Sequence, residues 1–363
     1  MKKVIVAAAG LMLVGTMATS AMAEFKFSGD ARTRFYYQSD YDYDPTTDDV
    51  EFGNSTASDS DTRFNSRVRF KIEADTKGGA YAKTRIVVGN GTFGEGEKGD
   101  VTTDYAYIGV PFGPITIEGG RMPRDITPFL FFDGRAEGIQ AKYRNNNTGL
   151  VVFYDTVDED ITNTDDDDLN RYGALLNQGF DGWNLTVGGF YQDDARYSSN
   201  DPNYTDGFAG TVKVDGTLAN IALTAEIAYQ DKDLNGNSDD GYGGYIQGVM
   251  PVGPVSLLGM IGTTQDGFEM DAADFGPFVM LNDYSQISTG FNFAEYGDSV
   301  FAALAPTYKA SEKLTLGAQV SMADVDADTG YDDFTAWEIG ATASYAVVDG
   351  AKLNGIIAYM DTD

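Results

Sequence analysis

Basic side chains at alternate positions are the feature of this sequence best suited to chemistry. In the segment 63–74, one face of an extended chain carries charge, because successive side chains of a strand point to opposite faces. That face consists of Arg63, Asn65, Arg67, Arg69, Lys71 and Glu73. The segment 25–38 repeats the pattern and places Arg32 and Arg34 on its polar face. Rows of charged groups in a narrow, low-dielectric passage select ions, and guanidinium groups favour anions.

The opposite faces of both segments are apolar or small. One of them carries Phe64, Val68, Phe70 and Ile72. A strand that is cationic on one side and apolar on the other fits a wall between water and lipid. Acidic residues on these strands are too few to neutralise the set, so we predict that the basic side chains line a pore. The alternative is that they pair with acidic neighbours inside the wall.

The absence of two residue types excludes several kinds of site. The chain has 363 residues without a single histidine or cysteine. Ser-His and Cys-His catalysis, disulfides, thiolate metal sites and haem attachment therefore have no residues to use. The spacing of the acidic residues identifies no catalytic pair of carboxylates. We therefore predict that the protein is not an enzyme and carries no cofactor. A net charge of −31 argues against nucleic-acid binding through a basic surface.

One acidic stretch has the spacing of a calcium loop. Its candidate ligands are Asp231, Asp233, Asn235 and Asp239, with Gly236 at the sharp turn. Carboxylates at this spacing suit Ca²⁺, but position twelve is Tyr242 instead of a bidentate glutamate. Two interpretations stay open, an external calcium site and a solvated acidic loop, and the missing glutamate favours the second.

The first 23 residues have the pattern of a signal peptide. Lys2 and Lys3 precede an apolar run, and Ala21-Met22-Ala23 is an A-x-A cleavage site. We predict an exported chain that begins at Glu24. No later stretch is long and apolar enough to cross a membrane as a helix, so any span must be made of strands.

The rest of the chain, residues 24–363, predicts an all-β fold in one domain: a transmembrane antiparallel β-barrel of 16–18 strands. Strands are expected near 25–38, 62–76, 80–90, 103–111, 115–121, 135–145, 150–156, 170–180, 183–192, 206–215, 220–230, 242–251, 255–265, 299–309, 314–323, 335–347 and 352–361. Short turns such as Asp181-Gly182 and Asp215-Gly216 alternate with long acidic segments such as 157–169 and 266–298. Barrels with short periplasmic turns and long external loops have this rhythm.

The predicted strand number is odd, whereas single-chain bacterial barrels normally have an even one. Two interpretations stay open. One strand is missed near 284–298, where Tyr284 to Phe293 also alternates, or the sequence stops before its final strand.

Two neighbouring stretches resemble the general porins of Gram-negative bacteria. One strand ends in Gly120-Arg121, and the next opens Gly134-Arg135-Ala136-Glu137-Gly138. The resemblance implies a trimeric outer-membrane barrel in contact with lipid and lipopolysaccharide, whose third loop folds inward between these strands. It also implies that Arg121 and Arg135 join Arg67 or Arg69 in an arginine wall.

The segment between these strands departs from the family pattern. Residues 122–133 are short and apolar, and only Asp125 and Asp133 can supply loop carboxylates opposite the arginines; Arg124 lies beside them. We expect passive diffusion of small hydrophilic solutes and ions through this constriction, with a local preference for anions. The alternative is a structural or adhesive barrel with a closed lumen.

Overall fold

A single antiparallel sheet makes up almost all of the structure. The computed structural model describes residues 24–38, 61–92, 101–131, 134–159, 168–197, 201, 204–235, 239–268, 270, 275–281, 292–327 and 333–362. The predicted signal peptide and Asp133 lie outside this range, as does most of the alternating stretch from Tyr284 to Phe293. No helix in the described part of the chain is long and apolar enough to cross a membrane.

Seventeen strands are found in the described residues, in the places that the alternation predicted. They are β1 Glu24–Gln38, β2 Asp61–Asp75, β3 Tyr81–Thr92, β4 Val101–Phe112, β5 Ile115–Arg124, β6 Gly134–Arg144, β7 Thr148–Glu159, β8 Asp168–Phe180, β9 Trp183–Asp194, β10 Gly207–Leu218, β11 Ile221–Gln230, β12 Gly241–Val252, β13 Val255–Gln265, β14 Gly297–Lys309, β15 Leu314–Ala327, β16 Phe334–Val348 and β17 Ala351–Thr362. Two short helical turns, α2 Lys232–Asn235 and η2 Phe293–Glu295, are the other elements of the described residues.

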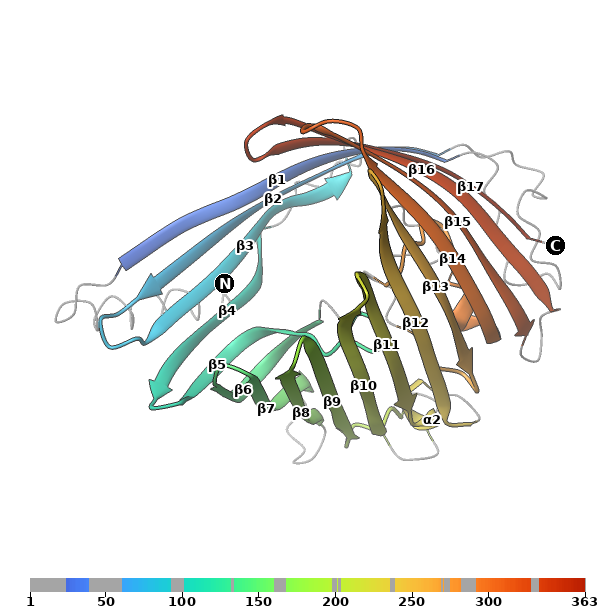
Figure 1. Cartoon of the computed structure of the whole chain (residues 1–363). Helices are drawn as coiled ribbons and strands as arrows, with labels where there is room; N and C mark the ends of the chain where they lie inside the picture. Colours follow the sequence, from blue (N-terminus) through green and yellow to red (C-terminus); the bar gives the residue numbers. More distant parts are fainter. Residues whose placement is uncertain are drawn as a thin grey trace.

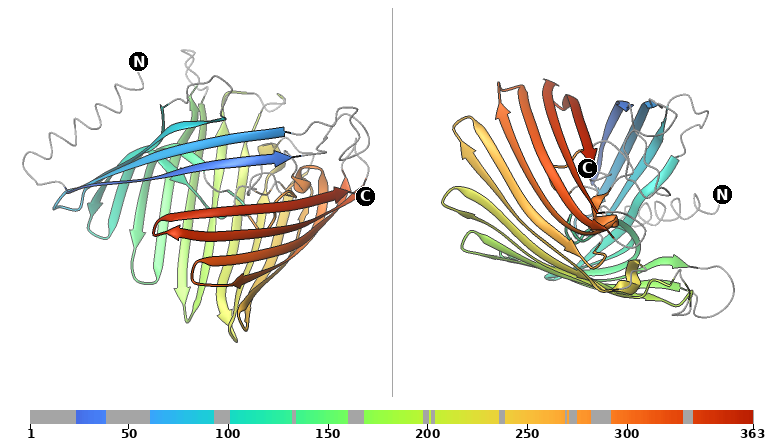
Figure 2. Two further views of the ribbon diagram at one scale, coloured as in Figure 1. Left: turned by 90° about the horizontal axis from the view of Figure 1, so that it is seen from above. Right: turned by 90° about the vertical axis from the view of Figure 1, so that its right-hand side faces the viewer.

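The strands follow one another around a barrel. Each pairs antiparallel with its neighbours in sequence, from β1 with β2 to β16 with β17. The sheet curls so that β1 and β2 lie across the barrel from β10 and β11 (Figure 1). Because sixteen reversals separate them, β1 and β17 run in the same direction, as the two further views show (Figure 2).

The short connections are tight turns, with one departure from the sequence prediction. Asp181 and Gly182 both have positive φ, 42° and 83°, as a two-residue hairpin turn requires. The turn predicted at Asp215-Gly216 is wrong. Those residues pair with Thr224 and Leu223, and the turn falls at Ala219-Asn220. Gly216 is there for packing, because a Cβ at this position would stand 2.1 Å from the Trp183 ring.

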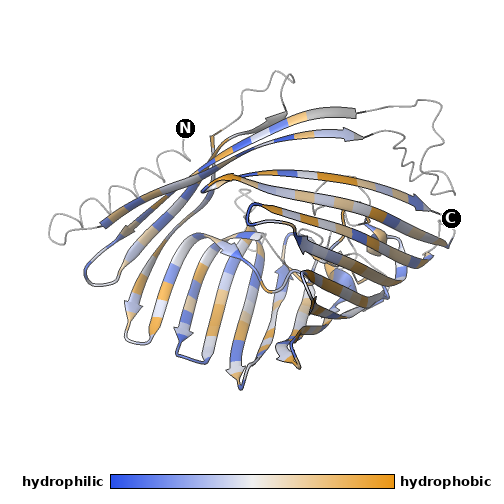
Figure 3. Ribbon diagram, turned by 45° about the horizontal axis from the view of Figure 1, so that its top comes forward, coloured by the Kyte–Doolittle hydropathy of each residue, from blue (hydrophilic) through white to orange (hydrophobic). Residues whose placement is uncertain are grey.

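The outer face of the barrel is apolar, as predicted. Phe64 and Phe70 of β2 are about half exposed, and Ile227 of β11 is 67% exposed. Hydrophobic and hydrophilic residues alternate along many of the strands (Figure 3). In a porin-type barrel this alternation separates a lipid-facing surface from a polar interior.

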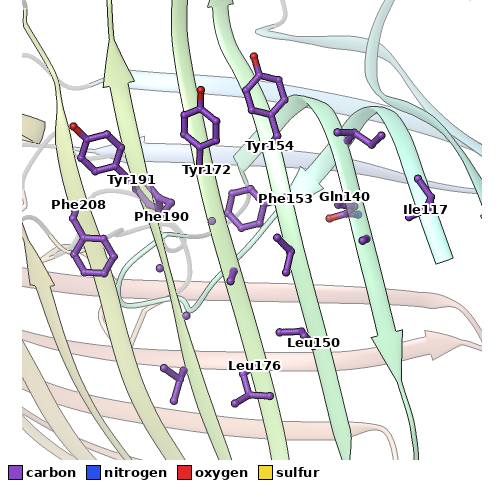
Figure 4. Close-up of a pocket in the computed structure, with 18 residues that line it drawn as sticks. Ile117, Gln140, Leu150, Phe153, Tyr154, Tyr172, Leu176, Phe190, Tyr191 and Phe208 are labelled. Atoms are coloured by element: carbon purple, nitrogen blue, oxygen red, sulfur yellow. The ribbon is translucent and has the colours of Figure 1, made fainter. Parts of the chain in front are cut away.

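An aromatic row crosses the outer face toward the end of the barrel where the long loops emerge. Tyr154, Tyr172, Tyr191 and Phe208 are register partners on β7, β8, β9 and β10. They lie side by side above a shallow apolar hollow (Figure 4). The Tyr191 hydroxyl donates to Asp206 at 2.7 Å. Rings with one apolar and one wet side mark a membrane–water interface, so the row resembles an aromatic girdle.

The cationic face of β1 to β3 points inward. Glu73 of β2 pairs with Lys83, and the register continues through Tyr107, Gly120 and Gly138 to the buried Asp155 on β7. Directly paired residues share a face of the sheet. The arginines therefore lie on the same side as Asp155, which is the side that the inward segments described below contact.

Candidate functional site

The third loop folds into the barrel. Its described residues, 125–131, make a tight turn in which the Phe131 N–H donates to the Thr127 carbonyl at 2.9 Å. The Thr127 hydroxyl donates to Glu226 of β11, a carboxylate that is 2% exposed and also accepts from Thr211 and Tyr245. The predicted infolded third loop is therefore confirmed, and it reaches across to the wall of β10 to β12.

Aromatic residues of this loop pack against that wall. Phe129 is fully buried, with its ring 5.1 Å from Tyr245 and 5.0 Å from Phe268. Phe131 contacts the ring of Phe190 and the guanidinium of Arg171. These rings form an apolar core with the barrel wall, because burial of large rings is strongly favoured over exposure to water.

A second segment also folds inward, and sequence reasoning missed it. Residues 275–281 belong to the connection between β13 and β14, which the rhythm of turns and loops predicts to be an external loop. Phe275 contacts Phe129 and Phe301, and the backbone N–H groups of Val279, Met280 and Leu281 donate to Glu338 of β16. The signal was present in the sequence, since this stretch is too rich in phenylalanine and methionine for a solvated loop.

The arginines of β1 and β2 form the cationic side of the interior. Arg32 and Arg67 are register partners, and Arg69 donates to Asp30 at 3.0 Å. Arg34 donates to the Tyr36 hydroxyl at 3.0 Å. Within the described residues, no carboxylate forms an ion pair with Arg32, Arg67 or Arg34. The buried Nε atoms of Arg32 and Arg67 have no hydrogen-bond partner there.

Acidic residues do neutralise the neighbouring cations. Arg85 of β3 and Arg135 of β6 both donate to Asp104 of β4, the second at 2.6 Å. Lys71 and Lys83 both lie near Glu73. Within the described residues, the interior surface of β1 to β4 is therefore partly neutralised, and its uncompensated cations are Arg32, Arg34 and Arg67.

Three of the predicted pore residues, all arginines, are paired with carboxylates. Arg124 is 4% exposed and donates to Asp155 at 2.6 Å and to Gln140 at 2.7 Å, so it is a buried structural residue. Arg121 is the register partner of Glu137, on the outer face that also carries Ile139. Arg135 shares Asp104 with Arg85, and its side chain is 14% exposed, so it is a paired residue at the start of β6. The resemblance placed Arg121 inward, but the alternation from Glu118 puts Met122 and Arg124 there.

A polar network ties Arg124 into the wall. Gln140 and Tyr81 donate to Glu118, and Lys142 lies 2.7 Å from the same carboxylate. The network keeps the inner surface of β3 to β7 hydrogen-bonded where the third loop begins. Asp125 at the start of the loop is exposed.

The predicted calcium loop is only partly described. Asp231 accepts from the Phe208 N–H at 2.5 Å and from the Tyr229 hydroxyl. Asp233 and Asn235 lie in α2, and residues 236–238 are outside the described range. Among the described residues, no group of three acidic side chains could hold a metal ion. The calcium site stays a prediction.

The interior is thus divided between two kinds of surface. The side formed by β10 to β16 is filled by the third loop and residues 275–281, which share one apolar cluster. The side formed by β1 and β2 presents arginines. Along the side formed by β1 and β2, these cationic groups raise the local concentration of anions.

Comparisons with known proteins agree with this architecture. A family model described as "Gram-negative porin" matches residues 7–363. The fold is similar to those of the outer membrane protein OprD from Pseudomonas aeruginosa (TM-score 0.61, 10% identity, 94% of this chain and 89% of that chain) and a BenF-like porin from Pseudomonas fluorescens Pf-5 (0.61, 11%, 94% and 94%). OccAB1 from Acinetobacter baumannii gives 0.61 at 13% identity, over 94% and 91%. At these identities the likeness concerns the fold alone. No curated protein sequence matches this one.

Proposed function

Because the chain belongs to the Gram-negative porin family, we propose that it is a passive diffusion channel for small hydrophilic solutes and ions, lined at its narrow part by arginines of β1 and β2. The protein is an outer-membrane porin by family and by fold. The arginine-lined path and its preference for anions are the new elements of the proposal.

The observation that carries the proposal is the register pair Arg32 and Arg67. Two guanidinium groups on adjacent strands repel each other, and the repulsion grows where the dielectric constant is low. A structural role would call for a carboxylate between them, as Asp30 provides for Arg69. An anion that passes along this wall supplies the missing negative charge.

Ion flow across a planar bilayer tests the proposal. We expect the purified barrel to conduct and to show an anion-selective reversal potential in a salt gradient. The triple variant R32Q/R34Q/R67Q should lose that selectivity while it still conducts. R121Q serves as the control, because it removes one arginine from the outer face. Absence of conductance would overturn the channel; a selectivity unchanged in the triple variant would overturn the arginine path.

The alternative function, a structural or adhesive barrel with a closed lumen, has one observation in its favour. Two inward segments fill the side of the interior formed by β10 to β16 with packed aromatic rings. Such a barrel would give no single-channel steps, yet it would migrate as a folded species in unheated gel electrophoresis. The bilayer recording therefore separates the two functions.

We also propose that the barrel is a homotrimer that contacts lipopolysaccharide. The family resemblance supports the trimer, and the acidic loops suit divalent cations shared with anionic lipid headgroups. Light scattering in detergent should give three times the mass of one chain. A monomer that stays monomeric in lipid nanodiscs would contradict this.

A further inference from the structure

Glu338 is a buried carboxylate that the proposed channel path does not use. It lies on β16, opposite Ser321 of β15, and its side chain is fully shielded from solvent. Five donors surround it: the backbone N–H groups of Val279, Met280 and Leu281, and the side chains of Gln319 and Ser321. Among the described residues, no lysine or arginine forms an ion pair with it.

This set of donors is unusual for a residue that serves the sheet alone. Gln319 and Ser321 are its neighbours on β15, but the three N–H groups come from a chain segment 57 to 59 residues away. Successive backbone N–H groups around one anion make a concave anion-binding site. Here the anion is part of the wall, and the segment that binds it comes from the connection between β13 and β14.

The segment is placed inside the barrel by the same contacts. Register carries the inner face from Phe301 of β14 to Ala323 of β15 and Ala336 of β16. Glu338 lies two residues after Ala336 on β16 and therefore points to the same side. Phe278, Val279 and Leu281 are each at most 2% exposed.

We propose that Glu338 is the positioning residue of a second constriction: it holds residues 278–281 against β15 and β16, and so narrows the channel in addition to the third loop. The narrowing rests on the proposed channel function. The anchoring of residues 278–281 by Glu338 does not rest on the channel function, because it can be measured without ion flow.

Glutamine at position 338 has nearly the same shape but cannot accept the same bonds. Its amide offers one oxygen and an NH₂ group that would face other N–H donors. The charge-assisted bonds are lost, and donors are left unpaired in an apolar surrounding, which is costly. E338Q should therefore free the segment without altering the packing volume of the wall.

A second variant reaches the same bond from the other side. M280P removes the Met280 N–H, which donates to Glu338 at 2.7 Å, and leaves β16 unchanged. M280A is its matched control, since it shortens the same side chain but keeps the N–H. E312Q controls for loss of an acidic charge, because Glu312 is exposed between β14 and β15.

Thiol labelling measures the anchoring. The chain has no cysteine, so L281C introduces the only thiol, at a fully buried position. The measurement uses folded barrels, identified by their heat-modifiable mobility in gel electrophoresis. We expect maleimide to label L281C at least roughly tenfold faster when E338Q or M280P is added. The reason is that loss of a charge-assisted bond favours local opening of the segment around residue 281. M280A and E312Q should leave the rate near that of L281C alone.

Conductance then tests the narrowing. E338Q and M280P should raise single-channel conductance above that of the unmodified barrel, and both controls should not. Equal labelling in all variants would overturn the anchoring. Faster labelling with unchanged conductance, in a barrel that conducts, would overturn the constriction. If no variant conducts, the channel function fails, and the labelling still decides the anchoring.

Discussion

The ring of Phe129 in the third loop lies 4.9 Å from the ring of Phe275 in the second inward segment. The two residues are far apart in sequence, and each segment is tied to a different carboxylate of the wall, Glu226 or Glu338. Phe275 also contacts Phe301 of β14. The two inward segments therefore share one apolar cluster, and a change in one should be felt by the other.

F129A should loosen the second segment although it lies in the first. Removal of a buried phenylalanine costs about 3–5 kcal/mol in a packed core, part of it from the cavity left behind. We expect maleimide to label L281C faster in F129A than in the parent. F25A is the control, because Phe25 is 46% exposed on the outer face. A labelling rate that F129A does not change would show that the segments are independent.

The strands and their faces could be predicted from the sequence because period-two alternation is a local property. It identified the cations of β1 and β2 as inward and Phe64 and Phe70 as outward. The inward path of residues 275–281 could not be derived in this way, because it depends on a bond to Glu338, a residue nearly sixty positions later. The aromatic content of the segment was the available signal.

Errors at single residues have local physical causes. The family pattern put Arg121 inward, but one position of alternation decides the face, and Glu118 and Arg124 occupy the inner one. Gly216 looked like a turn residue, yet it lies in a strand beneath the Trp183 ring. A glycine can mark a close approach as well as a turn, and the sequence does not distinguish them.

Arg124 and Arg121, near the start of the third loop, should differ in how much they stabilise the barrel, because only Arg124 is buried. Removal of one partner from a buried ion pair costs about 3–5 kcal/mol, because it leaves an uncompensated charge. R124Q should therefore lower the urea midpoint for barrel unfolding substantially. R121Q removes an exposed pair with Glu137, worth at most about 1 kcal/mol. Equal midpoints for the two variants would contradict the structural role of Arg124.

A charge on the outer face should be costly in proportion to its depth in the bilayer. Ile227 lies in the middle of the outward face of β11, whereas Leu218 is the last residue of β10. I227R should destabilise folding into lipid vesicles by about 2–4 kcal/mol, and L218R by about 0–1 kcal/mol. Urea titration in vesicles measures both. A larger cost at Leu218 would mean that the turn side is not at the interface.

Removal of the Asp30 carboxylate should change anion selectivity in the opposite direction to removal of an arginine. Asp30 accepts from Arg69 at 3.0 Å and is the acidic partner nearest the uncompensated pair Arg32 and Arg67. Removal of its charge in D30N leaves one more arginine uncompensated on the same wall, so anion selectivity should rise. R67Q should lower it. Reversal potentials in a salt gradient measure both, and the shifts should shrink at high salt, since the screening length falls from about 10 Å at 0.1 M to about 3 Å at 1 M. A shift of D30N toward cations, or no shift in either variant, would show that ions do not pass along β1 and β2.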